Sequence, residues 1–72
     1  MILDKKINKV AGYRVMAGLN QTEMGKVLGI TKQSYSNKER GVNQFNDSEK
    51  TMFKEFINDF FPGISIDEIF FS

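Results

Sequence analysis

The 72-residue chain contains neither cysteine nor histidine, and it has only one proline. Without cysteine it can form neither a disulfide nor a thiolate metal site. The absence of histidine removes the usual general base and the commonest metal ligand. Carboxylate pairs could still do acid–base work, but so short a chain leaves little room for a walled active-site cleft. We therefore expect a protein that is not an enzyme and that uses no metal or other cofactor.

Long apolar runs are also absent. No stretch approaches the ~20 residues needed to span a bilayer, and the N-terminus lacks the apolar segment of a signal peptide. With 40% apolar and 26% charged residues, the composition is typical of a soluble globular domain. The sequence predicts a single domain over residues 1–72, located in the cytoplasm and not associated with a membrane.

Charge is distributed unevenly along the chain, although the net charge is only +1. Residues 1–43 hold eight Lys or Arg against three Asp or Glu, a net charge of +5. Residues 44–72 hold two bases against six acids, a net charge of −4. A basic front and an acidic back are typical of a protein with one face that meets an anion, although an unevenly charged solvated surface has the same pattern.

Helix start and stop signals recur along the chain. A capping residue precedes a glutamate by three positions at Asn20 and Glu23, Asn46 and Glu49, and Ser65 and Glu68. Such pairs satisfy free amides at a helix start, and the acid favours the positive end of the helix dipole. Thr31 is a fourth cap candidate, without the acid. The stop signals are Gly18, Gly29, Gly41 and the pair Pro62-Gly63.

Apolar residues between these signals recur at helical spacing, and no segment shows convincing strand alternation. The expected helices span roughly residues 4–17, 21–28, 32–40 and 47–61, with a short fifth marked by Ile66, Ile69 and Phe70. The stripe of the first consists of Leu3, Ile7 and Val10, and that of the fourth of Met52, Phe53, Phe56, Ile57 and Phe60. The sequence therefore predicts an all-α fold, a compact five-helix domain in which helices too short to be stable alone share one core.

Residues 19–41 have the length pattern of a helix-turn-helix. A capped helix of two turns is followed by the break Gly29-Ile30-Thr31 and then by a second short helix. Gly29 can adopt the left-handed conformation that ends a helix, and Ile30 can fill the gap between the two helices. An ordinary helical hairpin has similar spacing, so this pattern alone leaves both structures open.

The outer face of the helix expected at 32–40 is polar and carries no acid. At about 100° per residue, an arc of about 140° holds five side chains, which are Lys32, Gln33, Ser36, Asn37 and Arg40. Lysine can donate to guanine, and glutamine and asparagine can make paired hydrogen bonds to adenine in the major groove. An exposed face without a partner would more often include acids, so the arc favours readout of DNA bases.

Two opposite charges are expected to meet inside the domain. Arg14 lies four residues after Val10, on the apolar stripe of the first helix, and Glu39 lies four residues after Tyr35, the only large apolar residue of the third. Either charge buried alone would cost several kcal/mol, so each is best explained by the other. The pair would fix the third helix against the first and has no catalytic role. The alternative is two exposed charges that never meet.

Three runs of sequence resemble a known family. They are Gly18-Leu19-Asn20-Gln21-Thr22-Glu23-Met24, Leu28-Gly29-Ile30-Thr31-Lys32-Gln33-Ser34-Tyr35-Ser36 and Glu39-Arg40-Gly41. Together with Arg14 before them and residues 65–70 after them, they resemble the Cro/CI-type helix-turn-helix of phage repressors, also called the XRE family. The resemblance covers nearly the whole chain. It implies a lambda-repressor-like fold and a protein that works in the cytoplasm of a bacterial host cell.

The resemblance also implies roles for individual residues. The matching base-reading positions are Lys32, Gln33 and Asn37, with Ser36 on the same face. The matching positions that contact DNA phosphates or backbone are Asn20, Gln21 and Arg40, with the loop after Gly41. Arg14 and Glu39 match an internal ion pair of the family. The chain departs from the family pattern at Gly25, where alanine is usual, and at Lys38, where an apolar residue is frequent.

The function that the resemblance implies is a DNA-binding transcriptional regulator of a phage lysis–lysogeny switch, whose partner is a double-stranded DNA operator. Family members usually bind as dimers across half-sites about one helical turn apart. A homodimer seam could form from the aromatic tail, which consists of Phe60, Phe61, Ile69, Phe70 and Phe71. Core filling is the alternative role of this tail, and Phe71 is its residue expected to be least buried.

An antirepressor is the alternative function. The whole sequence is similar to the small modulators of repression encoded beside repressors in temperate phages of Gram-positive bacteria. Such a protein would bind a partner phage repressor protein and change that protein's DNA binding. The low net charge favours this alternative, because phosphate contacts supply much of the affinity of a DNA-binding protein. The polar arc on the third helix favours DNA.

Overall fold

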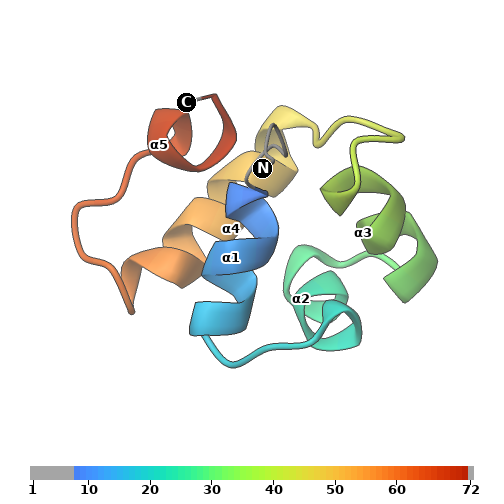
Figure 1. Cartoon of the computed structure of the whole chain (residues 1–72), viewed down its shortest axis with the longest axis horizontal. Helices are drawn as coiled ribbons and strands as arrows, with labels where there is room; N and C mark the ends of the chain where they lie inside the picture. The colour runs from blue at the N-terminus through green and yellow to red at the C-terminus, as the bar shows by residue number, and fades with distance from the viewer. Residues whose placement is uncertain (1–7, 72) are drawn as a thin grey trace, which may run out of the picture.

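A computed structural model describes residues 8–71, and all regular structure in this range is helical. The helices are α1 (Lys9–Met16), α2 (Gln21–Leu28), α3 (Lys32–Glu39), α4 (Asp47–Asn58) and α5 (Ile66–Phe70). In Figure 1, α1 and α4 occupy the middle of the molecule, α2 and α3 lie on one side, and α5 lies on the other. The all-α, five-helix fold predicted from the sequence is confirmed.

The predicted start and stop signals are used as expected. Capping boxes begin α2, α4 and α5, and in each the cap side chain accepts from the glutamate amide while the glutamate accepts from the cap amide. Thr31 caps α3 by accepting a hydrogen bond from the Ser34 amide. The four glycines at stop positions have φ between 76° and 87°, the left-handed region that favours glycine.

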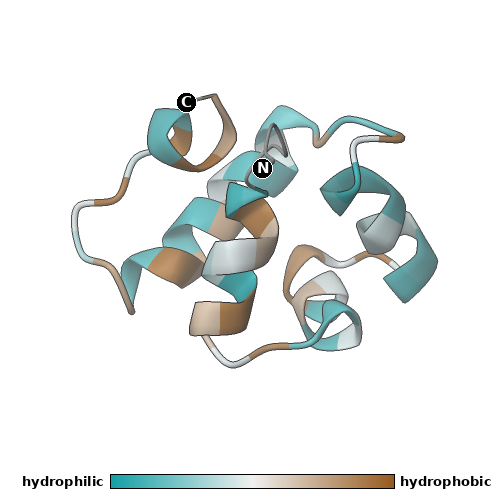
Figure 2. Ribbon diagram, in the orientation of Figure 1, coloured by the Kyte–Doolittle hydropathy of each residue, from teal (hydrophilic) through white to brown (hydrophobic). Residues whose placement is uncertain are grey.

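The core contains buried side chains from α2, α3, α4 and α5 and from one loop residue, Phe45. Its buried members are Met24, Leu28, Tyr35, Phe45, Phe53, Ile57 and Ile69. Phe45 lies in the loop between α3 and α4, and its ring centre is 5.3 Å from that of Phe70 and 6.0 Å from that of Tyr35. Tyr35 is the only large apolar residue of α3, which is drawn largely in hydrophilic teal in Figure 2. The position of α3 therefore depends on Tyr35 and on polar contacts.

The first helix is shorter than predicted. It begins at Lys9 and not near residue 4, because Asn8 is extended and caps the helix by accepting from the Ala11 amide. Leu3 and Ile7 of the predicted stripe lie outside the described residues. Val10, the third member of that stripe, packs against the core as expected.

The third and fourth helices also end earlier than predicted. α3 ends at Glu39, with Arg40 as its cap, and α4 ends at Asn58 and not at residue 61. Asn58 Oδ1 accepts a hydrogen bond from the Gly63 amide at 2.9 Å, which fixes the following turn to the helix end. Phe60 lies in this turn and is 48% exposed, so its predicted place on the apolar face of the helix is wrong.

Most residues of the aromatic tail pack inside the molecule. Ile69 is buried, and Phe61 and Phe70 are partly buried against the core. Phe60 and Phe71 are exposed, and Phe71 is the most exposed of the five at 63%, as predicted. Core filling therefore explains three of the five residues, and a homodimer seam stays a prediction.

Gly25 is required by a close approach of two backbone segments. A Cβ atom at this position would lie 3.0 Å from the carbonyl oxygen of Ile30 and 3.3 Å from that of Thr31. The glycine at this position thus has a steric reason in the turn between α2 and α3. Gly12 in α1 differs, because a Cβ atom added there would extend into open space, with no neighbouring atom within 4 Å.

Substituting alanine at these two glycines should change stability in opposite directions. We expect Gly12→Ala to stabilise the protein by about 0.5–1 kcal/mol, because alanine loses less backbone entropy in a helix. Gly25→Ala should destabilise it by about 1–3 kcal/mol, because the turn backbone must move away from the methyl group. Urea denaturation followed by circular dichroism measures both. Equal effects of the same sign would contradict the described turn.

Candidate nucleic-acid interface

The break between α2 and α3 is a tight turn closed by backbone hydrogen bonds. Gly29 has a φ of 76°, and the Ile30 amide donates to the Gly25 carbonyl at 2.9 Å. Ile30 is half-buried against the core, as predicted for a residue that fills the gap between the helices. Thr31 then caps α3. The order of a capped helix, a glycine turn and a second capped helix is that of a helix-turn-helix.

The predicted ion pair between Arg14 and Glu39 is formed and lies largely inside the molecule. Arg14 Nε donates to Glu39 Oε2 at 2.8 Å, and Arg14 Nη2 donates to Oε1 at 3.3 Å. The same carboxylate accepts the Tyr35 hydroxyl at 2.7 Å and the Gln21 side-chain amide at 3.0 Å. One carboxylate of α3 therefore holds side chains from α1, α2 and α3 itself.

These hydrogen bonds fix the charge state of the cluster. Burial alone would raise the pKa of Glu39, but the hydrogen bonds from Arg14, Tyr35 and Gln21 outweigh it and hold the pKa below its ordinary value. Burial, together with the Glu39 carboxylate, raises the pKa of Tyr35 far above its ordinary value, so the hydroxyl remains a donor. The hydrogen bond to Glu39 raises the pKa of Arg14 against the effect of desolvation. The cluster is a carboxylate, a guanidinium and a neutral phenol.

Asn8 adds a second connection between α1 and α3 that sequence reasoning missed. Its Oδ1 caps α1, and its Nδ2 donates to the backbone carbonyl of Glu39 at 3.0 Å. The signal in the sequence is weak, because residue Ala11 three positions later is not an acid and no capping box draws attention to Asn8. With the Arg14 pair, this bond fixes the C-terminal end of α3 against the start of α1.

The five residues of the predicted arc line the outer side of α3. Lys32, Gln33 and Arg40 are exposed, and Ser36 and Asn37 are half-buried. Asn37 Oδ1 accepts from Gln33 Nε2 at 3.1 Å and from Arg40 Nη2 at 2.7 Å. Asn37 therefore orients two of its neighbours on the arc, and the polar surface of α3 is partly organised before any partner binds.

The residues predicted to contact phosphates are not equally accessible. Asn20 is exposed at the start of α2, where its Oδ1 accepts from the Glu23 amide. Arg40 is exposed at the end of α3. Gln21 is half-buried, and its side-chain amide donates to Glu39 inside the domain. Asn20 and Arg40 can thus reach a phosphate, whereas Gln21 supports the Glu39 cluster, and its contact with DNA stays a prediction.

Lys38 of α3 forms an ion pair with Glu49. Its Nζ lies 2.6 Å from both Oε1 and Oε2 of Glu49, and both side chains are largely buried. Burial alone would raise the pKa of Glu49, but the bonds from Lys38 and the Asn46 amide hold it below its ordinary value. Sequence reasoning identified Glu49 only as a capping-box acid, so it missed that the same carboxylate ties α3 to the start of α4.

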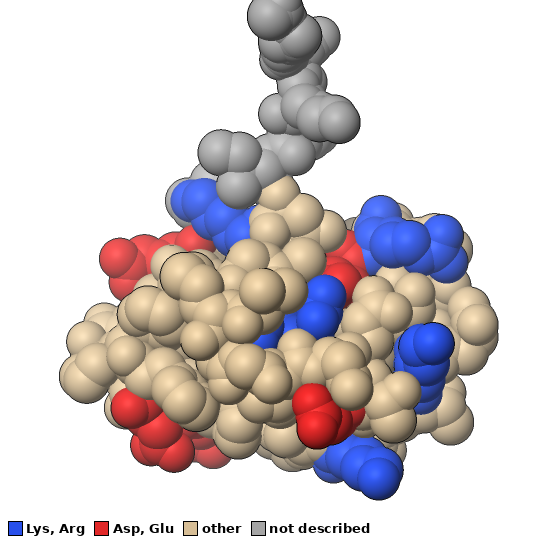
Figure 3. All heavy atoms as spheres, turned by 60° about the horizontal axis from the view of Figure 1, so that its bottom comes forward, with Lys and Arg blue, Asp and Glu red and all other residues tan. Residues whose placement is uncertain are grey.

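Basic and acidic side chains are both exposed on the surface that includes α2 and α3. In Figure 3, separate blue patches lie toward the right of the visible face with red patches among them, and the left of that face carries red patches and a blue patch. The exposed basic residues of α2, α3 and the α3 cap are Lys26, Lys32 and Arg40. Glu23 is the exposed acid of α2, and neither α3 nor its cap exposes a carboxylate.

Metal-binding groups and membrane-spanning helices are both absent from the described part of the chain. No group of three or more Asp or Glu side chains in residues 8–71 could hold a metal ion. No helix in the same range is long and apolar enough to cross a membrane. Comparison with known proteins found no matching family model, no matching curated protein and no matching solved structure. The site must therefore be interpreted from its own chemistry.

Removing Arg14 should be far more damaging than removing the exposed Arg40. We expect Arg14→Met to cost about 3–5 kcal/mol, because it leaves the Glu39 carboxylate buried without its cation. That loss is comparable to the whole stability of a domain of this size, so circular dichroism should show a largely unfolded protein at 25 °C. Arg40→Met removes the same charge from the surface and should stay folded. Two variants of equal stability would contradict the burial of the Arg14 pair.

Tyr35→Phe is a milder test of the same cluster. It removes one hydrogen bond to Glu39 and should lower the free energy of unfolding by about 1 kcal/mol or somewhat more. Urea denaturation of this variant gives a measurable midpoint where Arg14→Met does not. A variant as stable as the parent protein would argue against the hydrogen bond.

Proposed function

We propose that the protein is a DNA-binding transcriptional regulator and that α3 is the helix that enters the major groove. The observation that carries the proposal is the division of α3 into two faces. Tyr35 and Glu39 face the core, and the opposite arc from Lys32 to Arg40 exposes donors and acceptors without a carboxylate. Lysine, glutamine and asparagine are side chains that recognise base edges in the major groove.

The surroundings of α3 support the same proposal. Asn20 at the start of α2 and Arg40 at the end of α3 lie where they could hold phosphates on either side of the groove. The net charge of +5 on residues 1–43 would attract the DNA backbone, and the net charge of −4 on residues 44–72 would keep the other end away from it. The resemblance of residues 18–41 to phage repressors further suggests a regulator of a lysis–lysogeny switch in the bacterial cytoplasm.

Selection from random duplex DNA is the experiment that tests this proposal. The protein is incubated with a random library and excess competitor at about 150 mM salt, where non-specific binding is weak. We expect enrichment of one motif, and two related half-sites in it would identify a dimeric complex. A folded protein that enriches no motif would overturn the proposal.

The base-reading residues should decide affinity for the selected motif. Each good contact with a base contributes about 1–3 kcal/mol, so the triple variant Lys32→Ala, Gln33→Ala and Asn37→Ala should bind at least about 100-fold more weakly. Lys54→Ala on α4 removes one positive charge away from the arc and should bind almost as well as the parent protein. Fluorescence anisotropy with the labelled motif measures both. Similar losses in the two variants would indicate a general charge effect and no base readout.

An antirepressor that binds a partner repressor is the second candidate, and a specific observation favours it. Val42, just beyond the arc, is 62% exposed, and the net charge of the chain is only +1. An exposed valine beside polar side chains suits a protein interface better than a phosphate contact. An antirepressor would enrich no DNA motif and would reduce the DNA binding of a repressor added in equal amount.

A further inference from the structure

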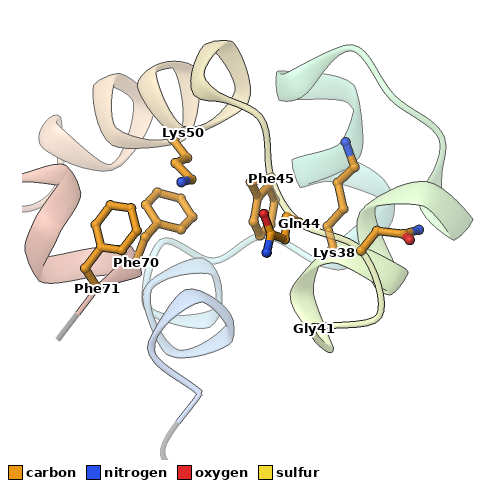
Figure 4. A pocket seen from close by; sticks show the side chains of 8 residues that line it. Lys38, Gly41, Gln44, Phe45, Lys50, Phe70 and Phe71 are labelled. Carbon is orange, nitrogen blue, oxygen red and sulfur yellow. The ribbon is translucent and has the colours of Figure 1, made fainter.

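A surface pocket of about 290 Å³ lies between the loop after α3, the first turn of α4 and the end of α5. Figure 4 shows Lys50 extending from α4 toward the rings of Phe70 and Phe71, while Lys38 stands on the other side of the pocket. Phe45 and the loop residues from Gly41 onward form the wall between them. The candidate DNA-contacting side chains of α2, α3 and the α3 cap, Arg40 included, do not line this pocket, whereas the loop after Gly41, which is also a candidate contact of the DNA backbone, forms part of its wall.

The two lysines of the pocket differ in their electrostatic partners. Lys38 is neutralised by Glu49, whose two carboxylate oxygens both lie 2.6 Å from its Nζ. Lys50 Nζ lies 4.4 Å from the ring centre of Phe71 and 6.0 Å from that of Phe70. No carboxylate among residues 8–71 forms an ion pair with Lys50. Among the described residues, Lys50 is therefore the lysine of the pocket that no carboxylate pairs.

Three of the residues that line the pocket are aromatic. Phe45 is buried, Phe70 is half-buried, and Phe71 is 63% exposed although its neighbour Phe70 packs against the core. The ring centres of Phe45 and Phe70 are 5.3 Å apart in an edge-to-face arrangement. A planar apolar group placed here would cover ring surface that is now in contact with water.

We propose that this pocket binds a small molecule that carries one carboxylate on an aromatic ring system. The Lys50 ammonium would donate to the carboxylate, and the ring system would lie against Phe70 and Phe71. The volume is at the lower end of the range for ligand sites, which suits one or two fused rings and excludes a nucleotide or a larger cofactor. A single lysine without an ion-pair partner in residues 8–71 suits a monoanion.

Ligand binding at this pocket would affect the polar arc of α3, because the loop that follows α3 is hydrogen-bonded to a residue of the arc. The amides of Val42 and Asn43 donate to the Asn37 carbonyl at 2.8 Å and 3.2 Å. A ligand that orders this loop would therefore also restrain Asn37, a candidate base-reading residue. This consequence rests on the proposed function, whereas binding of the ligand itself does not.

Titration of the ¹⁵N-labelled full chain with 1-naphthoate, followed by NMR, tests the proposal without DNA. We expect saturable shifts confined to the amides of residues 41–45, 50, 70 and 71. Acetate and inorganic phosphate, which lack the rings, and 1-naphthalenemethanol, which lacks the charge, should each bind at least about tenfold more weakly. Because no DNA is present, failure here leaves the proposed function untouched.

Two variants and a matched control identify the residues involved. Lys50→Gln and Phe71→Ala should each weaken 1-naphthoate binding at least about tenfold. Lys54→Gln is the control, because Lys54 is also half-buried and lies one turn further along α4. The proposal is overturned if 1-naphthoate does not saturate, if its shifts lie elsewhere, if any of the three reference compounds binds equally well, or if Lys54→Gln has the same effect as Lys50→Gln.

Discussion

The Glu39 carboxylate is the interaction on which the arrangement of the other elements depends. α3 has one large apolar side chain, Tyr35, so hydrophobic burial alone cannot fix its orientation. Glu39 provides the additional contacts that orient α3, because it accepts hydrogen bonds from α1, α2 and Tyr35 at distances of 2.7–3.3 Å. Burying either Arg14 or Glu39 without the other would be costly, so the pair favours the one orientation of α3 in which both charges are satisfied.

This arrangement leaves the outer side of α3 free for recognition. The outer face of the helix can be polar because its inner face is held by Tyr35, Glu39 and Lys38, of which two act through ion pairs with α1 and α4. The same two pairs remove Glu39 and Glu49 from the surface near the arc. The exposed basic side chains of α3 and its cap, Lys32 and Arg40, are therefore not offset by a carboxylate of α3 itself.

Much of this structure could be predicted from sequence because its signals are local. The capping residues Asn20, Thr31, Asn46 and Ser65 each act within three residues, and α2 has the predicted bounds. The Arg14–Glu39 pair is predictable because each charge falls on an apolar stripe.

The remaining features depend on contacts that form only in the folded chain. The roles of Asn8 and Glu49 are not visible in the sequence, because each side chain does two tasks and the second partner is distant along the chain. The end of α4 differs from the prediction because Asn58 accepts from Gly63 only in the folded turn. Periodicity alone extends the helix through Phe60, since it carries no information about that turn.

The pKa of the Glu39 side chain tests the role of this carboxylate most directly. It can be followed through the carboxyl carbon shift by NMR as the pH is lowered. A pKa below the ordinary value of 4.5 is predicted, because burial is outweighed by hydrogen bonds that favour the ionised form. Since the folded value is then lower than the unfolded value, the stabilising effect of Glu39 is complete above pH 4.5 and is lost as the pH falls through the folded pKa. A pKa at or above 4.5 would contradict the proposed anchoring of α3.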